Sequence, residues 1–182
     1  MIAQLKASAS LILGAVCLIW AVEAVNVLSG RQLTSLGILP RHLSGLIGIP
    51  LSPFLHGSVN HATVNTMPFL VLGGLVALRG ARAFASVSIF VILCGGVAVW
   101  LFGRASYHIG ASGLIFGYFG YLMARGWYER SSAAILTALL TLFLYGGLVW
   151  GVLPSRSFIS WEGHLFGMLA GVLAARWQGS QE

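Results

Sequence analysis

The sequence predicts an all-α membrane protein, one domain over residues 1–182 with six transmembrane helices and a long outer loop between the first two. Of the 182 residues, 58% are hydrophobic and only 8% are charged, and the mean hydropathy is +0.90. A soluble domain has roughly a quarter of its residues charged. The apolar residues form runs near the length that crosses a bilayer. The 24 glycines are typical of transmembrane helices that pack closely.

Each apolar run is expected to form one helix. The first run follows Lys6, as in a signal peptide, but it is too long for an h-region and no A-x-A site ends it, so we expect a retained helix. The later connections are short, which favours antiparallel neighbours. The expected helices are about 9–28, 60–78, 84–102, 111–126, 132–152 and 161–177.

The connection 29–59 is too apolar for a free linker, because its Gly, Pro and Ser residues are mixed with Leu and Ile. We expect a folded loop that rests in the outer leaflet or against the bundle. Lys and Arg concentrate in cytoplasmic loops, which favours cytoplasmic termini and an outer position for this loop. The inner residues are then Lys6, Arg79, Arg82, Arg125, Arg130 and Arg176, and the outer ones Arg31, Arg41, Arg104 and Arg156.

Composition also excludes several functions. The formal charge of +6 does not indicate nucleic-acid binding, because the basic residues lie singly or in pairs between apolar runs. The chain has no aspartate, which leaves a two-carboxylate protease little to work with, and no HExxH motif for zinc. Cys17 and Cys94 lie in separate apolar runs and indicate no metal site. We expect no cofactor and no metal.

Ser112 is the first candidate for chemistry. It lies in Gly110–Ala111–Ser112–Gly113 at the start of the fourth expected helix. Flanking glycines leave its hydroxyl accessible, and a helix N-terminus offers free backbone N–H groups that can stabilise an oxyanion. The alternative is that Ser112 merely caps the helix.

His164 is the second candidate, because it lies one turn into an apolar helix and needs a polar partner. Gly163, Gly167 and Gly171 form overlapping GxxxG steps beside it, and Gly113 and Gly117 form another on the fourth helix. Small residues at this spacing let helix backbones approach closely. We therefore expect these two helices to pack glycine to glycine. That packing would bring Ser112 within hydrogen-bond reach of His164, which would act as its base.

No third catalytic residue is expected to orient His164. Glu162 is the nearest carboxylate, but residues two apart on a helix do not share a face. The sequence therefore predicts a dyad, with the imidazole held by an aromatic ring of the fourth helix, either Phe116 or Tyr118.

A third group of polar residues is His56, His61 and Asn65. His61 and Asn65 are four apart and lie on one helix face, where both can donate hydrogen bonds. Two such donors can supplement a backbone N–H in an oxyanion hole, each contributing roughly 3 kcal/mol to the transition state. His56 lies off that face and is expected to fix the loop. A three-histidine metal site and the interior histidines of a transporter remain alternatives.

Glu23 lies within the first expected helix. It is interpreted either as an acceptor of hydrogen bonds from the long loop or as a functional carboxylate.

These motifs together resemble the rhomboid proteases. The resemblance covers about residues 10–177 and includes Gly110–Gly117, the His56/His61/Asn65 spacing, Gly163–His164 and the loop segments Gly37–Arg41 and Pro53–Gly57. It implies an intramembrane serine endopeptidase that cuts transmembrane proteins near their outer end. It also implies a protein of the bacterial plasma membrane. The sequence makes no prediction of the oligomeric state.

The resemblance further implies a role for each matching residue. Ser112 is the nucleophile and His164 the general base. His61, Asn65 and the Ser112 N–H form the oxyanion hole, and Gly110 shapes the turn before the serine. A non-catalytic rhomboid-like protein that binds membrane helices is the alternative, and a small transporter or channel is a third possibility.

Overall fold

The computed structural model describes residues 2–154 and 159–179 and is helical, with no strand among these residues. The long segments in chain order are α1 Ile2–Leu28, α3 Val59–Ala77, α4 Ala81–Phe90 continued by the π-helical η4 Val91–Gly95 and α5 Gly96–Phe102, α6 Ser112–Glu129, α7 Ser132–Tyr145 continued by the 3-10 helix η5 Gly146–Val152, and α8 Trp161–Gly179. The short elements of the long loop are η1 Gln32–Leu36, η2 Leu43–Ile47, α2 Gly48–Leu51 and η3 Ser52–Phe54.

The all-helical fold class is confirmed. Within the described residues, three helical segments are long and apolar enough to cross a membrane, over 6–28, 81–102 and 132–152. The segments α3, α6 and α8 have 18 or 19 residues each, but histidine, asparagine, glutamate and many glycines lower their hydropathy. The fourth expected helix is longer than predicted, because α6 continues to Glu129 instead of ending near residue 126.

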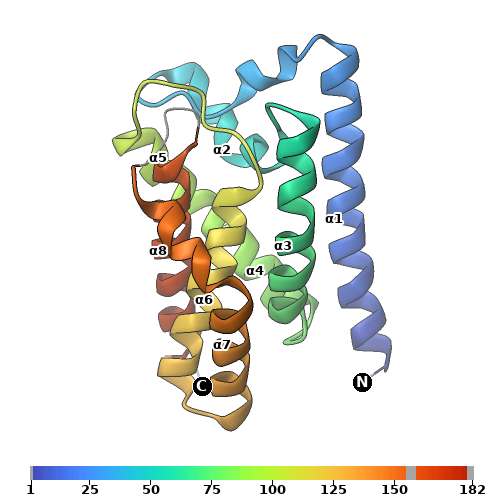
Figure 1. Cartoon of the computed structure of the whole chain (residues 1–182), viewed down its shortest axis with the longest axis vertical. Coiled ribbons are helices and arrows are strands. Elements are labelled where there is room, and N and C mark those ends of the chain that lie inside the picture. The colour runs from blue at the N-terminus through green and yellow to red at the C-terminus, as the bar shows by residue number, and fades with distance from the viewer. Residues whose placement is uncertain (1, 155–158, 180–182) are drawn as a thin grey trace.

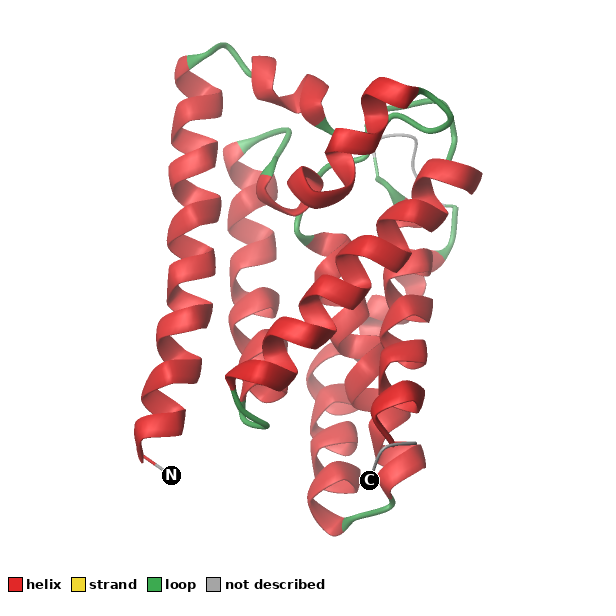
Figure 2. Ribbon diagram, turned by 180° about the vertical axis from the view of Figure 1, so that it is seen from behind, coloured by secondary structure: helices red, strands yellow, loops and turns green. Residues whose placement is uncertain are grey.

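The start of α1 and the end of α8 lie at the same end of the bundle, and the long loop covers the opposite end (Figure 1). Helix α1 stands beside α3 at one edge, as the view from behind also shows (Figure 2). Helix α6 lies in the middle and packs against α3, α7 and α8. It is the best buried helix, because every residue from Leu114 to Leu122 is buried.

Glycines set the close approach of α6 and α8. A Cβ on Gly167 would overlap the carbonyl oxygen of Gly113, and a Cβ on Gly171 would overlap that of Gly117. These are the GxxxG steps of the two helices, so the predicted glycine-to-glycine packing is confirmed. Because Gly113 follows Ser112 and Gly167 lies one turn after His164, this packing sets how far apart the two candidate residues lie.

The long loop is folded against the bundle, as expected. Ile38 and Ile49 are buried in a small core with Val99 of α5. The backbones of Ile38 and His108 pair through two hydrogen bonds of 2.9 and 3.1 Å. The Arg41 guanidinium donates to the Gly103 carbonyl over 2.8 Å. The loop therefore fixes residues 103–111, the segment that leads to Ser112.

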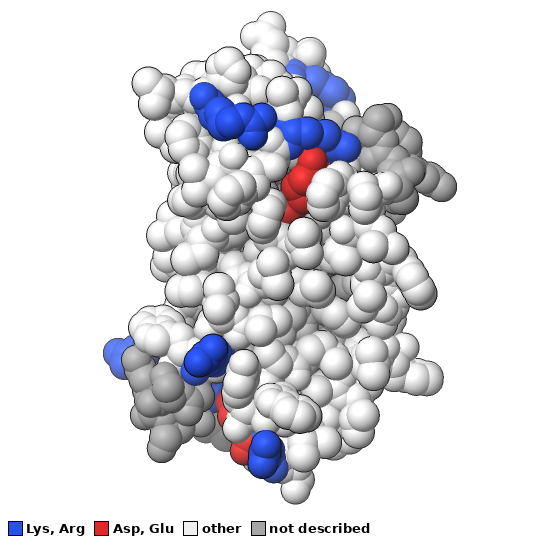
Figure 3. All heavy atoms as spheres, turned by 90° about the vertical axis from the view of Figure 1, so that its left-hand side faces the viewer, with Lys and Arg blue, Asp and Glu red and all other residues white. Residues whose placement is uncertain are grey.

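Charged side chains gather at the two ends of the face drawn in Figure 3, with an uncharged belt between them. At the end near the chain termini, Glu129 pairs with Arg79 and Arg125. At the loop end, Glu162 pairs with Arg104 over 3.5 Å. An uncharged belt between two charged rims is what a bilayer requires. Of the cationic residues assigned to the outer side, Arg156 lies outside the described residues.

Candidate active site

The candidate residues face one cavity of about 820 Å³ at the loop end of the bundle. Its walls are α3, the segment 103–111, the start of α6, η5 and the start of α8. Four predicted site residues line it together, namely Ser112, His164, His61 and Asn65. The fold thus brings together side chains from three helices that are far apart in the sequence.

Ser112 is the first residue of α6. The cap position is Ala111, and no side chain caps this helix, so the interpretation of Ser112 as a capping residue is wrong. Gly110 has φ of +115°, a conformation that favours glycine. A Cβ there would also lie 2.8 Å from the Nε2 atom of His61. Glycine at this position is therefore needed twice, for the turn into α6 and for the approach of His61.

His164 is oriented by a backbone carbonyl. Its Nδ1 atom lies 2.8 Å from the carbonyl oxygen of Gly151 in η5. Because a carbonyl can only accept, the neutral ring carries its proton on Nδ1 and leaves the Nε2 lone pair free to accept another. The protein thereby selects the tautomer that a general base needs.

The ring of His164 is also stacked on Phe116, with centroids 4.0 Å apart and planes inclined by 6°. The expectation of an aromatic support is confirmed for Phe116. Tyr118, the other candidate, is fully buried between Phe69 and Phe84 and its hydroxyl bonds to Ser88. Among the described residues no hydrogen bond joins Ser112 to His164, although both line the cavity. Such contacts are often long in the absence of substrate.

Glu162 does not contact His164. Its buried carboxylate accepts a hydrogen bond of 3.3 Å from the Arg104 N–H and pairs with the Arg104 guanidinium. The carboxylate is therefore used to hold the segment 103–111 on α8, and the site contains a Ser–His pair without an acidic third residue.

His61 and Asn65 lie on one face of α3, toward the cavity. Helix α3 begins where it does because the Ser58 hydroxyl caps it, accepting from the His61 N–H over 3.0 Å. The Asn65 side chain is buried, and its Nδ2 donor has no partner among the described residues. A buried donor without a partner is costly, so Asn65 Nδ2 stands out as a polar group that the described side chains leave unsatisfied.

His56 lies outside the cavity and fixes the loop, as expected. Its Nε2 atom accepts from the Ala111 N–H over 3.3 Å, and its carbonyl accepts from Asn26 and Arg31. Burial, together with the neighbouring His61, lowers the pKa of His56 to about 4. The neutral ring therefore ties the loop to the residue before Ser112.

Glu23 pairs with the long loop. Its carboxylate lies 3.1 Å from the guanidinium of Arg31, just after the end of α1. The interpretation of Glu23 as an acceptor for the loop is thus confirmed.

The sequence matches the family model of the Rhomboid domain over residues 41–180. The chain belongs to the rhomboid family. An uncharacterized protein of Mycobacterium tuberculosis is 40% identical over 173 residues, which cover 90% of this chain and 72% of the relative. An uncharacterized protein of Mycobacterium leprae is 39% identical over 90% of this chain and 68% of its own length. RHOMBOID-like protein 4 of Arabidopsis thaliana is 28% identical over 66% of this chain and 31% of that protein.

Family membership and the apolar helices make this rhomboid an integral membrane protein. Within the described part of the chain, no three His, Cys or Glu side chains gather closely enough to hold a metal ion. The rings of His56 and His61 pack edge to face with centroids 5.0 Å apart, whereas His164 is stacked on Phe116.

Sequence reasoning missed two contacts of this rhomboid site. The Gly151 carbonyl is a backbone group and carries no sequence signal. The second contact is made by His108. Its position four residues before the candidate nucleophile is visible in the sequence, but its burial is seen only in the structure.

Proposed function

We propose that this rhomboid is an intramembrane serine endopeptidase that cuts transmembrane segments of other membrane proteins near their outer end. The observation that carries the proposal is the 2.8 Å separation of His164 Nδ1 from the Gly151 carbonyl oxygen. The Gly151 carbonyl keeps the proton on Nδ1, so Nε2 is available to a hydroxyl in the cavity that His164 shares with Ser112.

In the proposed reaction, His164 Nε2 takes the proton of Ser112 as the hydroxyl oxygen attacks the scissile carbonyl carbon. The resulting imidazolium keeps its Nδ1 bond to Gly151 and lies on the face of Phe116, which attracts a cation. It then protonates the leaving amine. Water, activated by the same ring, hydrolyses the acyl-enzyme and restores Ser112.

The oxyanion of the tetrahedral intermediate would be bound by His61, Asn65 and the Ser112 N–H. Support comes from the unpaired Asn65 Nδ2 donor and from the first turn of α6, whose N–H groups have no partner within the helix. Each donor would contribute roughly 3 kcal/mol to the transition state. Because Gly110 has no Cβ, the His61 ring has room to lie beside the turn that leads to Ser112.

The proposed topology has six membrane spans, with both termini cytoplasmic and the cavity toward the outer surface. The uncharged belt between two charged rims supports it, as does the position of the cavity beside the charged loop end. Polar groups at membrane depth are tolerable only in a water-filled cavity. The mycobacterial relatives favour a bacterial plasma membrane.

A non-catalytic protein that binds membrane helices is the second candidate. One observation favours it, the missing hydrogen bond between Ser112 and His164. The two functions differ in a cleavage assay with a purified single-span reporter whose transmembrane segment carries small residues near its outer end. If the protein is a protease, the wild type cuts the reporter and the Ser112→Ala variant does not, although both variants bind it. Binding without cleavage by the wild type would support the second candidate.

A further inference from the structure

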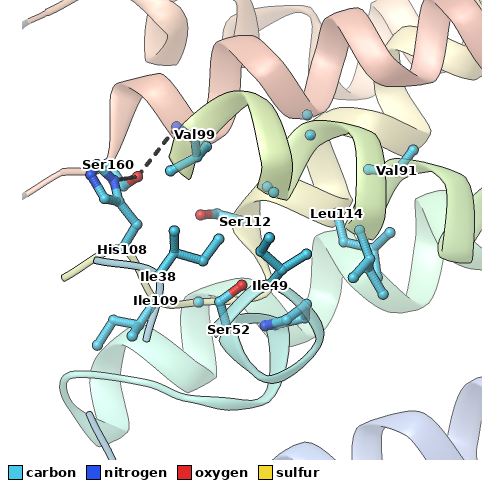
Figure 4. A pocket seen from close by; sticks show the side chains of 18 residues that line it. Ile38, Ile49, Ser52, Val91, Val99, His108, Ile109, Ser112, Leu114 and Ser160 are labelled. Carbon is cyan, nitrogen blue, oxygen red and sulfur yellow. Dashed lines mark hydrogen bonds between the residues drawn. The ribbon is translucent and has the colours of Figure 1, made fainter. Parts of the chain in front are cut away.

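His108 joins two segments that carry the proposed catalytic residues. Its side chain is buried and makes two hydrogen bonds. Nδ1 lies 2.6 Å from the Ser160 hydroxyl (Figure 4), and Nε2 lies 3.1 Å from the Arg104 carbonyl oxygen. Because the carbonyl can only accept, Nε2 carries the proton, and Nδ1 accepts from the Ser160 O–H. Burial lowers the pKa of His108, which favours this neutral form.

Ser160 in turn starts the helix of the proposed base. Its hydroxyl oxygen accepts from the Gly163 N–H over 3.3 Å, and its carbonyl accepts from the His164 N–H over 3.2 Å. Ser160 therefore accepts hydrogen bonds from two N–H groups of the first turn of α8 and donates one from its own hydroxyl to His108. A shift of Ser160 would move the turn that holds His164.

The backbone of the segment that leads to Ser112 is also held in place. The backbone of His108 pairs with Ile38 through two hydrogen bonds, and the Gly110 N–H donates to the Ser52 carbonyl over 2.8 Å. Ser112 follows only four residues after His108. The short stretch between them thus has little freedom, and the position of His108 is passed on to Ser112.

We propose that His108 is a positioning residue, which sets the separation of Ser112 and His164 by bonding the nucleophile segment to the start of α8. This role rests on the proposed protease function. His108 does not line the large cavity; it faces a small cavity of about 50 Å³ behind Ser112 (Figure 4), so it would not touch the substrate. The ion pair of Arg104 with Glu162 is a second connection between the same two segments.

The test is the time course of labelling by a fluorophosphonate probe, for wild type, His108→Phe and His108→Asn. The final extent of labelling counts folded sites, and the rate constant per site reports how well Ser112 and His164 are aligned. His108→Phe keeps a ring but loses both hydrogen bonds; we expect full extent and a rate constant reduced roughly tenfold, because small misplacements are costly. His108→Asn keeps a polar group near Nδ1 and should recover part of the rate.

Two results would overturn the positioning role. One is a wild-type rate constant in His108→Phe, and the other is a lower extent of labelling at an unchanged rate constant, which indicates a folding role only. The matched control is Ala105→Ser, an exposed position in the same segment, which should label like the wild type.

A double-mutant cycle with Ser160→Ala separates this proposal from the protease function. If the two residues act through one hydrogen bond, Ser160→Ala should lower the melting temperature less in His108→Phe than in the wild type. Additive losses would show that the His108–Ser160 bond has no effect and would overturn the proposal. The melting cycle needs no activity. An unlabelled wild type with a coupled cycle would therefore overturn the protease function, and with it the positioning role, while leaving the bond itself established.

Discussion

The imidazole of His164 lies flat on the phenyl ring of Phe116, with 4.0 Å between the ring centroids. Phe116 is one turn after Ser112 on α6, so the helix that carries the proposed nucleophile also supports the proposed base. The Gly151 carbonyl fixes the same imidazole at its edge. The base is therefore oriented by a ring face and a backbone carbonyl, without a carboxylate.

Removing the aromatic support should slow the reaction without unfolding the protein. We expect Phe116→Leu to lower the cleavage rate roughly tenfold, because the imidazole loses its parallel neighbour and the attraction of an imidazolium to the ring face. Phe116→Tyr keeps the ring and should stay near the wild-type rate. Phe102→Leu is the control, because that exposed ring pairs with Phe166 outside the site. Equal rates for Phe116→Leu and Phe102→Leu would contradict the supporting role.

A methyl group between α6 and α8 should destabilise the bundle. Gly171→Ala would place its Cβ on the Gly117 carbonyl oxygen, so the helices must separate; we expect a loss of about 1–3 kcal/mol or more and a lower melting temperature. Gly14→Ala in α1 is the matched control, because nothing lies within 4 Å of its Cβ. If Gly171→Ala and Gly14→Ala have the same melting temperature, the close glycine packing does not stabilise the fold.

Acidification should destabilise the folded state through His56. Its pKa is about 4 in the folded protein and 6.5 when unperturbed, so between these values the unfolded state binds more protons. Stability is then lost as the pH falls from about 6.5 to 4, by at most about 3 kcal/mol for this residue. Melting temperatures at pH 7 and pH 4 should therefore differ more in the wild type than in His56→Gln. The exposed His42 provides the control: His42→Gln should keep the wild-type difference.

Cleavage should also fall at low pH, because His164 must be neutral to accept the proton of Ser112. The rate should therefore decrease as the pH falls through the pKa of His164 and the ring becomes protonated. The rate is measured per folded molecule, with unfolding monitored in parallel so that the effect of His56 is not counted. A rate that stays constant down to pH 4 would argue against His164 as the base.

The sequence could predict features that depend on composition or on fixed helical spacing. The apolar runs placed the helices to within a few residues at most ends, although α1 begins earlier than expected, at Ile2. The GxxxG steps predicted the approach of α6 to α8, because spacing alone determines that face. The sequence also predicted an aromatic support for the base on the fourth helix, but it left Phe116 and Tyr118 as alternatives, and the structure selects Phe116.

The sequence could not predict contacts made by backbone groups or between distant segments. Every residue has a backbone carbonyl, so the residue type at position 151 does not predict this contact. The carbonyl lies beside His164 because the 3-10 helix η5, which continues α7, carries Gly151 there. The bond from His108 to Ser160 spans 52 residues and arises only when the long loop fixes the segment 103–111. The expected bond from Ser112 to His164 is not seen between these two described residues, because helix spacing predicts the approach of the backbones but not the side-chain positions within the cavity.

The most direct test of the account is labelling of the detergent-purified protein with a fluorophosphonate probe, which reacts with activated serines. Wild type, Ser112→Ala and His164→Ala are compared after each is shown to be folded and monodisperse. The dyad predicts labelling of the wild type, none of Ser112→Ala, and at most a trace for His164→Ala. A folded wild type that is not labelled, or a His164→Ala variant labelled as fast as the wild type, would contradict the proposed serine protease.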